Sequence, residues 1–127
     1  MKDGLRIAMA YSADCNKYFT DSEPWKLTKT DMARCKQVVN TALNALFLLC
    51  VMLEPFMPSF SAKVYEQLAI PRELKHETLI EQVKKNPKII KDLIPAGHKI
   101  GNPAPLFRII TEEEAEGWKE QFKGKKK

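Results

Sequence analysis

The sequence has few of the residues that build metal centres or disulfide frameworks. Its three cysteines, Cys15, Cys35 and Cys50, form no Cys-x-x-Cys pair, and the two histidines, His76 and His98, lie far from them. Structural zinc sites and disulfide-stabilised domains both depend on closely patterned cysteines. We therefore expect no metal, and we expect Cys35 and Cys50, which lie in apolar helical patterns, to be small core residues in a reducing compartment.

The sequence also lacks a signal region and an apolar run long enough to span a membrane. Residues 1–4 do not form an apolar signal segment. The longest apolar run, residues 38–53, is about 16 residues long and includes Asn40 and Asn44, whereas a transmembrane helix needs about 20 residues. We expect this run to be a buried helix, the chain to have no membrane partner, and its location to be cytoplasmic.

Charge of one sign is in excess only at the C-terminus. The formal net charge is +5, but four of the 21 basic residues are lysines in the stretch 123–127, which leaves 17 basic against 16 acidic residues in residues 1–122. Such a stretch is typical of a solvated tail or the start of a linker, and it is weak evidence for phosphate binding. With 44% hydrophobic residues overall, residues 1–122 are predicted to form one globular domain.

What the sequence does contain is helical periodicity. A first helix is predicted over about residues 3–19, with two apolar stripes that need two packing partners. A second helix is predicted to begin after Thr30, whose side chain would cap it, to have Asp31 in its first turn, and to stop before Pro55. This helix needs neighbours on several sides, because its apolar residues include the stripe Val39, Leu43, Leu46, Cys50 and Leu53.

The second half of the chain is predicted to hold shorter helices. One follows Pro58 over about residues 61–69, and one or two more lie in residues 73–93, interrupted at Asn86-Pro87. Residues 95–105 form an irregular, extended passage rich in proline and glycine, and residues 106–110 either pair as a strand or simply pack. Thr111 caps a last helix that reaches Phe122. Together these elements predict an all-α helical bundle with an extended segment and a C-terminal helix.

A large aromatic residue follows the first predicted helix in a polar setting. Residues 16–24 are mostly polar and predict a loop, and Trp25 comes directly after Pro24, which fixes the backbone angle beside it. An unpaired nucleobase gains about 1–3 kcal/mol by stacking on such a side chain. Tryptophan is also largely buried on average, so Trp25 is either a platform for base stacking or a core anchor that docks a helix.

Five segments of the chain resemble a known family. They are Asn16-Lys17-Tyr18, Glu23-Pro24-Trp25-Lys26, Leu53-Glu54-Pro55-Phe56-Met57-Pro58, Pro95-Ala96-Gly97-His98-Lys99-Ile100-Gly101 and Pro105-Leu106-Phe107. They are similar to the end of the anticodon-binding helical domain of methionyl-tRNA synthetase, most like the eukaryotic cytosolic form, over about residues 4–122. The segment 53–58 is also similar in the leucine, isoleucine and valine enzymes, whereas the spacing from segment 16–18 to Pro24-Trp25, together with segment 95–101, points to the methionine enzyme.

The resemblance implies roles for the residues whose positions match the family's motif. Trp25 would stack on the splayed cytosine that begins the methionine anticodon, Pro24 would position it, and tRNA is the implied partner. Two roles stay open for Asn16, namely a hydrogen bond to a base or phosphate and a cap on the end of the first helix. Phosphate contact and plain solvated charge are both open for three lysines, Lys17, Lys26 and Lys29.

Other parts of that family have no counterpart in this sequence. They are the family's base-reading asparagine and arginine on an earlier helix, and the His-Ile-Gly-His and Lys-Met-Ser-Lys-Ser signatures of its catalytic domain. The implied function is anticodon binding that helps a methionyl-tRNA synthetase select methionine tRNA for ATP-dependent aminoacylation, with a catalytic domain as partner in cis or in trans. ATP and methionine would bind that domain, so we expect no cofactor, no catalytic residue and no activity in this chain alone.

Two other functions stay open at this point. The apolar faces of the two long helices also suit a stand-alone helical fragment that binds another protein, and segment 53–58 also suits the anticodon domain of a leucine, isoleucine or valine enzyme. A lone histidine such as His98 is more often structural than catalytic. The resemblance also implies that Trp118 and Phe122 pack against the bundle or against the neighbouring catalytic domain.

Overall fold

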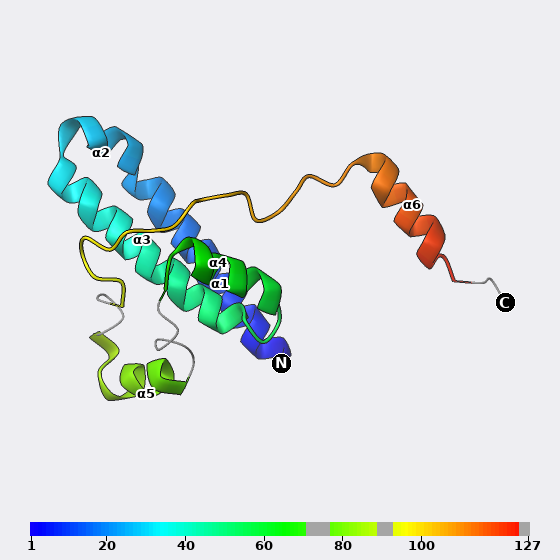
Figure 1. Ribbon diagram of the computed structural model, residues 1–127, viewed down its shortest axis with the longest axis horizontal. Coiled ribbons are helices and arrows are strands. Elements are labelled where there is room, and N and C mark those ends of the chain that lie inside the picture. Colours follow the sequence, from blue (N-terminus) through cyan, green and yellow to red (C-terminus); the bar gives the residue numbers. More distant parts are fainter. Residues whose placement is uncertain (71–76, 89–92, 125–127) are drawn as a thin grey trace.

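The computed structural model describes residues 1–70, 77–88 and 93–124, and this part of the chain contains six helices and no β strand. In chain order they are α1 (Lys2–Ser22), α2 (Pro24–Thr30), α3 (Met32–Leu53), α4 (Pro58–Gln67), α5 (Glu77–Lys85) and α6 (Glu112–Phe122). Figure 1 shows α1 and α3 running antiparallel, with α6 set apart at the end of a long extended stretch. The predicted all-α fold with an extended segment and a C-terminal helix is confirmed.

The short helix α2 joins α1 to α3 through two sharp corners. Glu23 adopts a left-handed conformation, with φ 42° and ψ 56°, and its N–H donates to the Thr20 carbonyl at 3.3 Å. Pro24 is the first residue of α2, a position where the missing N–H leaves no helical hydrogen bond unmade. Asp31 separates α2 from α3, and its carboxylate accepts a hydrogen bond from the Arg34 N–H at 3.0 Å.

Two sequence predictions are wrong at these corners. Thr30 does not cap α3, because its hydroxyl donates to the Lys26 carbonyl at 3.3 Å and Asp31 occupies the capping position. The first helix was predicted to end near residue 19 and to be followed by a loop, but α1 continues to Ser22. A polar, solvent-facing stretch of helix has the same composition as a polar loop, so amino-acid composition does not distinguish the two here.

The main core lies where α3, α4 and α5 meet. Phe47 is fully buried, and its ring packs edge to face against that of Tyr65, with 5.9 Å between the ring centroids. Cys35 and Cys50 are buried as predicted, but Val39 is 38% exposed while Val38 is fully buried. The buried face of α3 near its start is therefore one residue away from the predicted stripe. The other core residues are Val64, Leu68, Ile70, Leu79, Leu93 and Ile94.

A smaller cluster forms where α1 packs on α3. Ala8 is fully buried there against Leu49 and Leu53 of α3. In contrast, Ile7 and Met9 on α1 are more than half exposed. Within the described residues, then, α1 buries only part of the two apolar stripes that its sequence predicts.

The helix α3 is longer than the apolar run that predicts it. Among the described residues it is the one helix that could span a membrane by length and composition, with 22 residues and a mean hydropathy of 1.5. It contacts α1, α2 and α4, and its buried side chains include the polar residue Asn44. The central helix of a helical bundle satisfies the same length and composition criteria.

The extended segment 95–105 crosses the bundle and is held there by hydrogen bonds to the end of α4. The His98 Nε2 atom lies 2.7 Å from the Leu68 carbonyl oxygen, and the Gly101 N–H donates to the Gln67 carbonyl at 2.8 Å. The Gln67 amide also donates to the Ala104 carbonyl at 3.1 Å and accepts from the Ala104 N–H at 3.2 Å. One glutamine side chain therefore satisfies both backbone groups of Ala104.

Residues 106–110 do not form a strand, and they pack only in part, because Leu106 lies against the core whereas Ile109 is 91% exposed. The Phe107 ring stacks on that of Phe60 in α4, with 5.4 Å between centroids and 18° between planes. The start of α4 also differs from the prediction: it begins at Pro58 and not near residue 61, because proline is well suited to the first helical position. The predicted helices in residues 73–93 are described only as α5, and their parts in 71–76 and 89–92 lie outside the described residues.

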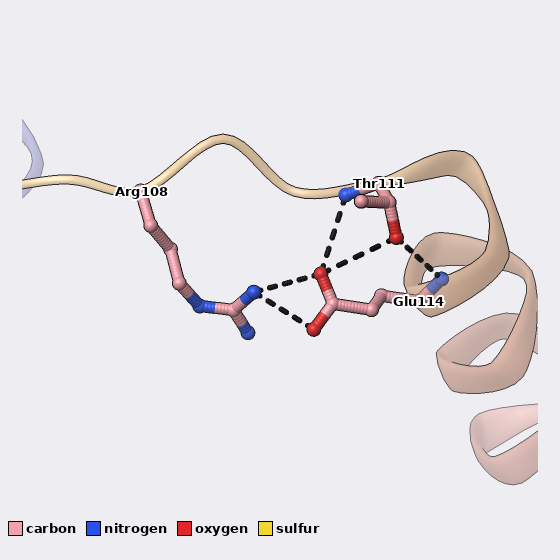
Figure 2. Close-up of polar contacts among 3 residues, drawn as sticks. All are labelled: Arg108, Thr111 and Glu114. Carbon is pink, nitrogen blue, oxygen red and sulfur yellow. Dashed lines mark hydrogen bonds and ion pairs between the residues drawn. The ribbon is translucent and has the colours of Figure 1, made fainter.

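The start of α6 is fixed by a group of local contacts (Figure 2). The Thr111 hydroxyl accepts from the Glu114 N–H at 3.3 Å, and the Glu114 carboxylate accepts from the Thr111 N–H at 3.2 Å. Arg108 Nη1 lies 2.7 Å from each Glu114 carboxylate oxygen, and this interaction holds the pKa of Glu114 below its usual value. The predicted Thr111 cap is confirmed. Trp118 and Phe122 are 44% and 78% exposed, so they are not buried against the bundle.

Candidate nucleic-acid interface

Trp25 is a surface residue in the first turn of α2, and its side chain is 52% exposed. Because it lies on a helix, the predicted loop setting is wrong, and the alternative of a core anchor is also excluded. The neighbouring Pro24 is the residue that anchors α2, since it is buried and its carbonyl accepts a hydrogen bond from the Cys35 Sγ atom at 3.4 Å. The buried proline thus fixes the backbone from which the indole projects.

The indole of Trp25 has one aromatic neighbour in the described part of the chain. The Phe19 ring, near the end of α1, meets it at 64° between planes, with 6.2 Å between ring centroids. Phe19 is itself 40% exposed, so the two rings form a shared aromatic surface at the corner between α1 and α2. The Thr28 hydroxyl donates to the Trp25 carbonyl at 2.8 Å and further fixes the first turn of α2.

Asn16 lies within α1, six residues before the helix ends at Ser22, so its predicted role as a cap is wrong. Its side chain is exposed and lines a small cavity of about 160 Å³ between α1 and α3. Phe19 lines the same cavity, which connects Asn16 to the aromatic surface around Trp25. Cys15 also lines it, and partial burial raises the pKa of this thiol.

The three candidate lysines differ in the charges that surround them. The Lys26 Nζ atom lies 2.6 Å from the Glu23 Oε1 atom, and the Lys17 Nζ atom lies 3.9 Å from the Asp21 Oδ2 atom. Lys29, in the last turn of α2, has no ion pair within the described residues. These carboxylates offset the positive charge of Lys17 and Lys26, although exposed ion pairs are worth at most about 1 kcal/mol and can be exchanged for a phosphate contact at small cost. Lys29 is the cation with the least competition from carboxylates.

The candidate site is therefore formed by the end of α1, the turn at Glu23 and the helix α2. Pro24, Trp25, Lys26 and Lys29 lie on α2, whereas Asn16 and Lys17 lie on the preceding turns of α1. Figure 1 shows that these turns and α2 lie at the same end of the α1–α3 pair. Sequence reasoning missed two residues, Phe19 and Cys35. The signal for Phe19 was available, because this residue ends the helix predicted over residues 3–19.

Comparison with known proteins identifies the family. A family model described as the anticodon binding domain of methionyl tRNA ligase matches residues 6–127. The chain belongs to this family. A probable methionine-tRNA ligase of Oryza sativa subsp. japonica is 40% identical over 129 aligned residues, which cover 98% of this chain and 16% of the relative. A cytoplasmic methionine-tRNA ligase of Arabidopsis thaliana is 39% identical, with 98% and 15% covered.

The Homo sapiens cytoplasmic methionine-tRNA ligase is 33% identical over 98% of this chain and 13% of its own length. The chain thus spans about one-sixth or less of the length of these curated relatives. The names of these ligases favour the methionine enzyme over a leucine, isoleucine or valine enzyme and over a stand-alone interaction fragment. The resemblance in the sequence to the anticodon-binding domain of this family is confirmed.

Proposed function

We propose that this chain supplies an anticodon-reading surface to a methionyl-tRNA ligase, on which Trp25 stacks against the unpaired cytosine that begins the methionine anticodon. The observation that carries the proposal is that the Trp25 side chain is half exposed while the preceding residue, Pro24, is buried, in a chain of the anticodon-binding family. Unpaired bases in RNA loops can be splayed out and stacked on aromatic side chains, and each base stacked in this way contributes about 1–3 kcal/mol.

The residues around Trp25 suit the remaining parts of an RNA contact. Lys29, on the same helix, has no ion pair within the described residues and provides a cation for a loop phosphate, whereas Lys17 and Lys26 could exchange their carboxylate partners for phosphates. Asn16 carries an exposed carboxamide, which can donate and accept hydrogen bonds at the edge of a base or at a phosphate. Phosphate contacts position the RNA, whereas stacking and base-edge contacts give the preference for one base.

In the whole protein, this surface helps to select methionine tRNA for aminoacylation. The partners are tRNA and the catalytic domain of the ligase, which binds ATP and methionine and performs the reaction. The names of the relatives from Arabidopsis, Bos taurus and Homo sapiens support a cytoplasmic location. The chain by itself is expected to bind RNA without charging it.

The experiment that tests the proposal compares two anticodon stem-loops at one fixed salt concentration. One carries the methionine anticodon, and the other has its first base changed from cytosine to uracil. We expect the chain to bind the first more tightly, and we expect Trp25→Ala to remove that preference. Trp118→Ala is the matched control, because Trp118 has a similar exposure but lies on α6, and it should leave the preference unchanged.

Equal binding of the two loops, unaffected by Trp25→Ala, would contradict the proposal. A preference that survives Trp25→Ala would place the base reading on other residues. A competition with leucine, isoleucine and valine tRNAs tests the identity of the ligase in the same assay. Preference for any of these three over methionine tRNA would likewise overturn the proposal.

A further inference from the structure

The contact between Phe19 and Trp25 crosses the corner between α1 and α2. Only Glu23 separates the two helices, and its left-handed conformation turns the chain so that the last turns of α1 face the first turn of α2. The two rings meet at 64° with centroids 6.2 Å apart, which is an edge-to-face geometry. This geometry is attractive because the positive edge of one ring meets the negative face of the other.

We infer that Phe19 is a positioning residue that sets the orientation of the Trp25 indole and thereby the preference for the stacked base. The inference rests on the proposed function of Trp25 and extends it to a residue that does not itself need to touch RNA. Phe19 lies near the end of α1, where it lines the small cavity that Ala45, Leu46 and Leu49 of α3 also line.

Trp25 needs a positioning contact because its side chain is not held by core packing. Its side chain is 52% exposed and belongs to neither core cluster, so core packing does not fix its rotamer. A side chain that must be immobilised on binding loses conformational entropy, whereas one held in its bound orientation loses less. An aromatic edge contact of this kind corresponds to about a twofold to tenfold effect on a population or a binding constant. Removing the Phe19 ring should change recognition by a factor of this size.

Two substitutions separate the ring contact from simple apolar volume. Phe19→Leu keeps an apolar side chain in the cavity but removes the aromatic ring, and Phe19→Tyr keeps the ring. Both are made in a Trp118→Phe background, in which Trp25 is the one remaining tryptophan, because the sequence contains two. Fluorescence anisotropy of Trp25 is then measured in the full 127-residue chain without RNA, and the two stem-loops are titrated afterwards. Urea unfolding of each variant reports its stability.

We expect Phe19→Leu to lower the Trp25 anisotropy and to reduce the preference for the cytosine-first loop by about twofold to tenfold, with Phe19→Tyr restoring both. An unchanged anisotropy and an unchanged preference in Phe19→Leu would overturn the inference. So would an equal loss of affinity for both loops that follows a loss of stability, because that pattern describes a purely structural role.

The two proposals fail in different ways. If Trp25→Ala leaves RNA binding unchanged, the proposed function of Trp25 is wrong, and the inference about base preference falls with it. If Trp25→Ala removes the preference while Phe19→Leu retains it, only the positioning role of Phe19 is wrong. The anisotropy of the free chain adds a readout that depends on no RNA, so the ring contact is tested in either case.

Discussion

Asn44 and the backbone of Ile94 exchange two hydrogen bonds across 50 positions of sequence. The Asn44 Oδ1 atom accepts from the Ile94 N–H at 2.7 Å, and the Asn44 Nδ2 atom donates to the Ile94 carbonyl at 3.3 Å. Asn44 is only 2% exposed, so water cannot replace these bonds easily. One buried carboxamide on α3 thereby fixes the point at which the extended segment begins.

Replacing Asn44 by leucine should therefore destabilise the chain. The substitution leaves the buried Ile94 N–H and carbonyl without their partners, and an unsatisfied buried group costs about 1–3 kcal/mol. Urea unfolding of Asn44→Leu should show a loss of this size. Asn102→Ala is the control, because Asn102 is exposed on the same segment and a surface substitution usually changes stability by less than about 0.5 kcal/mol. An Asn44→Leu variant as stable as the wild type would show that the Ile94 groups find other partners.

Gly101→Ala should weaken the attachment of the extended segment to α4. A Cβ atom at this position would lie 3.1 Å from the Glu66 carbonyl oxygen and 3.3 Å from that of Gln67, and both are backbone atoms with little room to move. Overpacking of this kind costs about 1–3 kcal/mol. Urea unfolding measures the loss, and faster hydrogen exchange of the residue-101 amide would localise it, because that N–H donates to Gln67.

The matched glycine substitution should have the opposite effect. Gly117 lies within α6, and a Cβ atom added there meets nothing within 4 Å. Alanine in an exposed helix interior is favoured over glycine by about 0.5–1 kcal/mol. Gly117→Ala should therefore slow amide exchange in α6. If Gly101→Ala and Gly117→Ala changed stability in the same direction, the close approach at Gly101 would not be the cause.

Lys29→Ala should reduce the salt dependence of RNA binding. Each phosphate contact to a single strand contributes about 0.7 to the slope of log K against log salt concentration, so the slope should become shallower by about that amount. The loss of affinity should be equal for the cytosine-first and uracil-first loops, because phosphates carry no base identity. Lys119→Ala on α6 is the control and should leave the slope unchanged. An unchanged slope in Lys29→Ala would remove this residue from the interface.

The start of α6 should depend on pH through Glu114. Its pKa is lowered in the folded chain, chiefly by Arg108 and also by Thr111, so the stabilisation is present above the unfolded pKa and is lost as pH falls through the folded pKa. NMR titration of the Glu114 carboxyl group should give a pKa below that of an ordinary glutamate. Arg108→Gln should raise this pKa and move the acid fraying of α6 to higher pH. No change in Arg108→Gln would assign the shift to the Thr111 cap alone.

Elements with a strong local signal could be predicted from the sequence, and the start of α6 is the plainest case. Thr111 followed three residues later by Glu114 specifies its own hydrogen bonds, whatever the rest of the chain does. The end of α1 could not be predicted in this way. The prediction ended the helix near residue 19, whereas α1 stops only where Glu23 turns into the left-handed region. Residue type alone gives little warning of such a turn.

The candidate site shows the same division. The sequence shows the pair Pro24-Trp25, but it does not show which of the two residues docks onto α3. The exposure of the Trp25 side chain depends on that choice. The structure buries Pro24 against Cys35 and leaves Trp25 outside. The contact between Phe19 and Trp25 depends on the turn at Glu23, so it could not be predicted while the segment between residue 19 and Trp25 was assigned to a loop.

The hydrogen bonds of Gln67 to Ala104 reproduce the pair that a neighbouring β strand would supply, from a single side chain of a helical protein. At Ala104, this attachment depends on the side chain of Gln67 and not on the side chain of Ala104 itself. Positions such as Ala104, whose contribution is made by backbone atoms alone, are therefore free to diverge in evolution. Gln67, in contrast, should be replaceable only by a residue that both donates and accepts in the same plane.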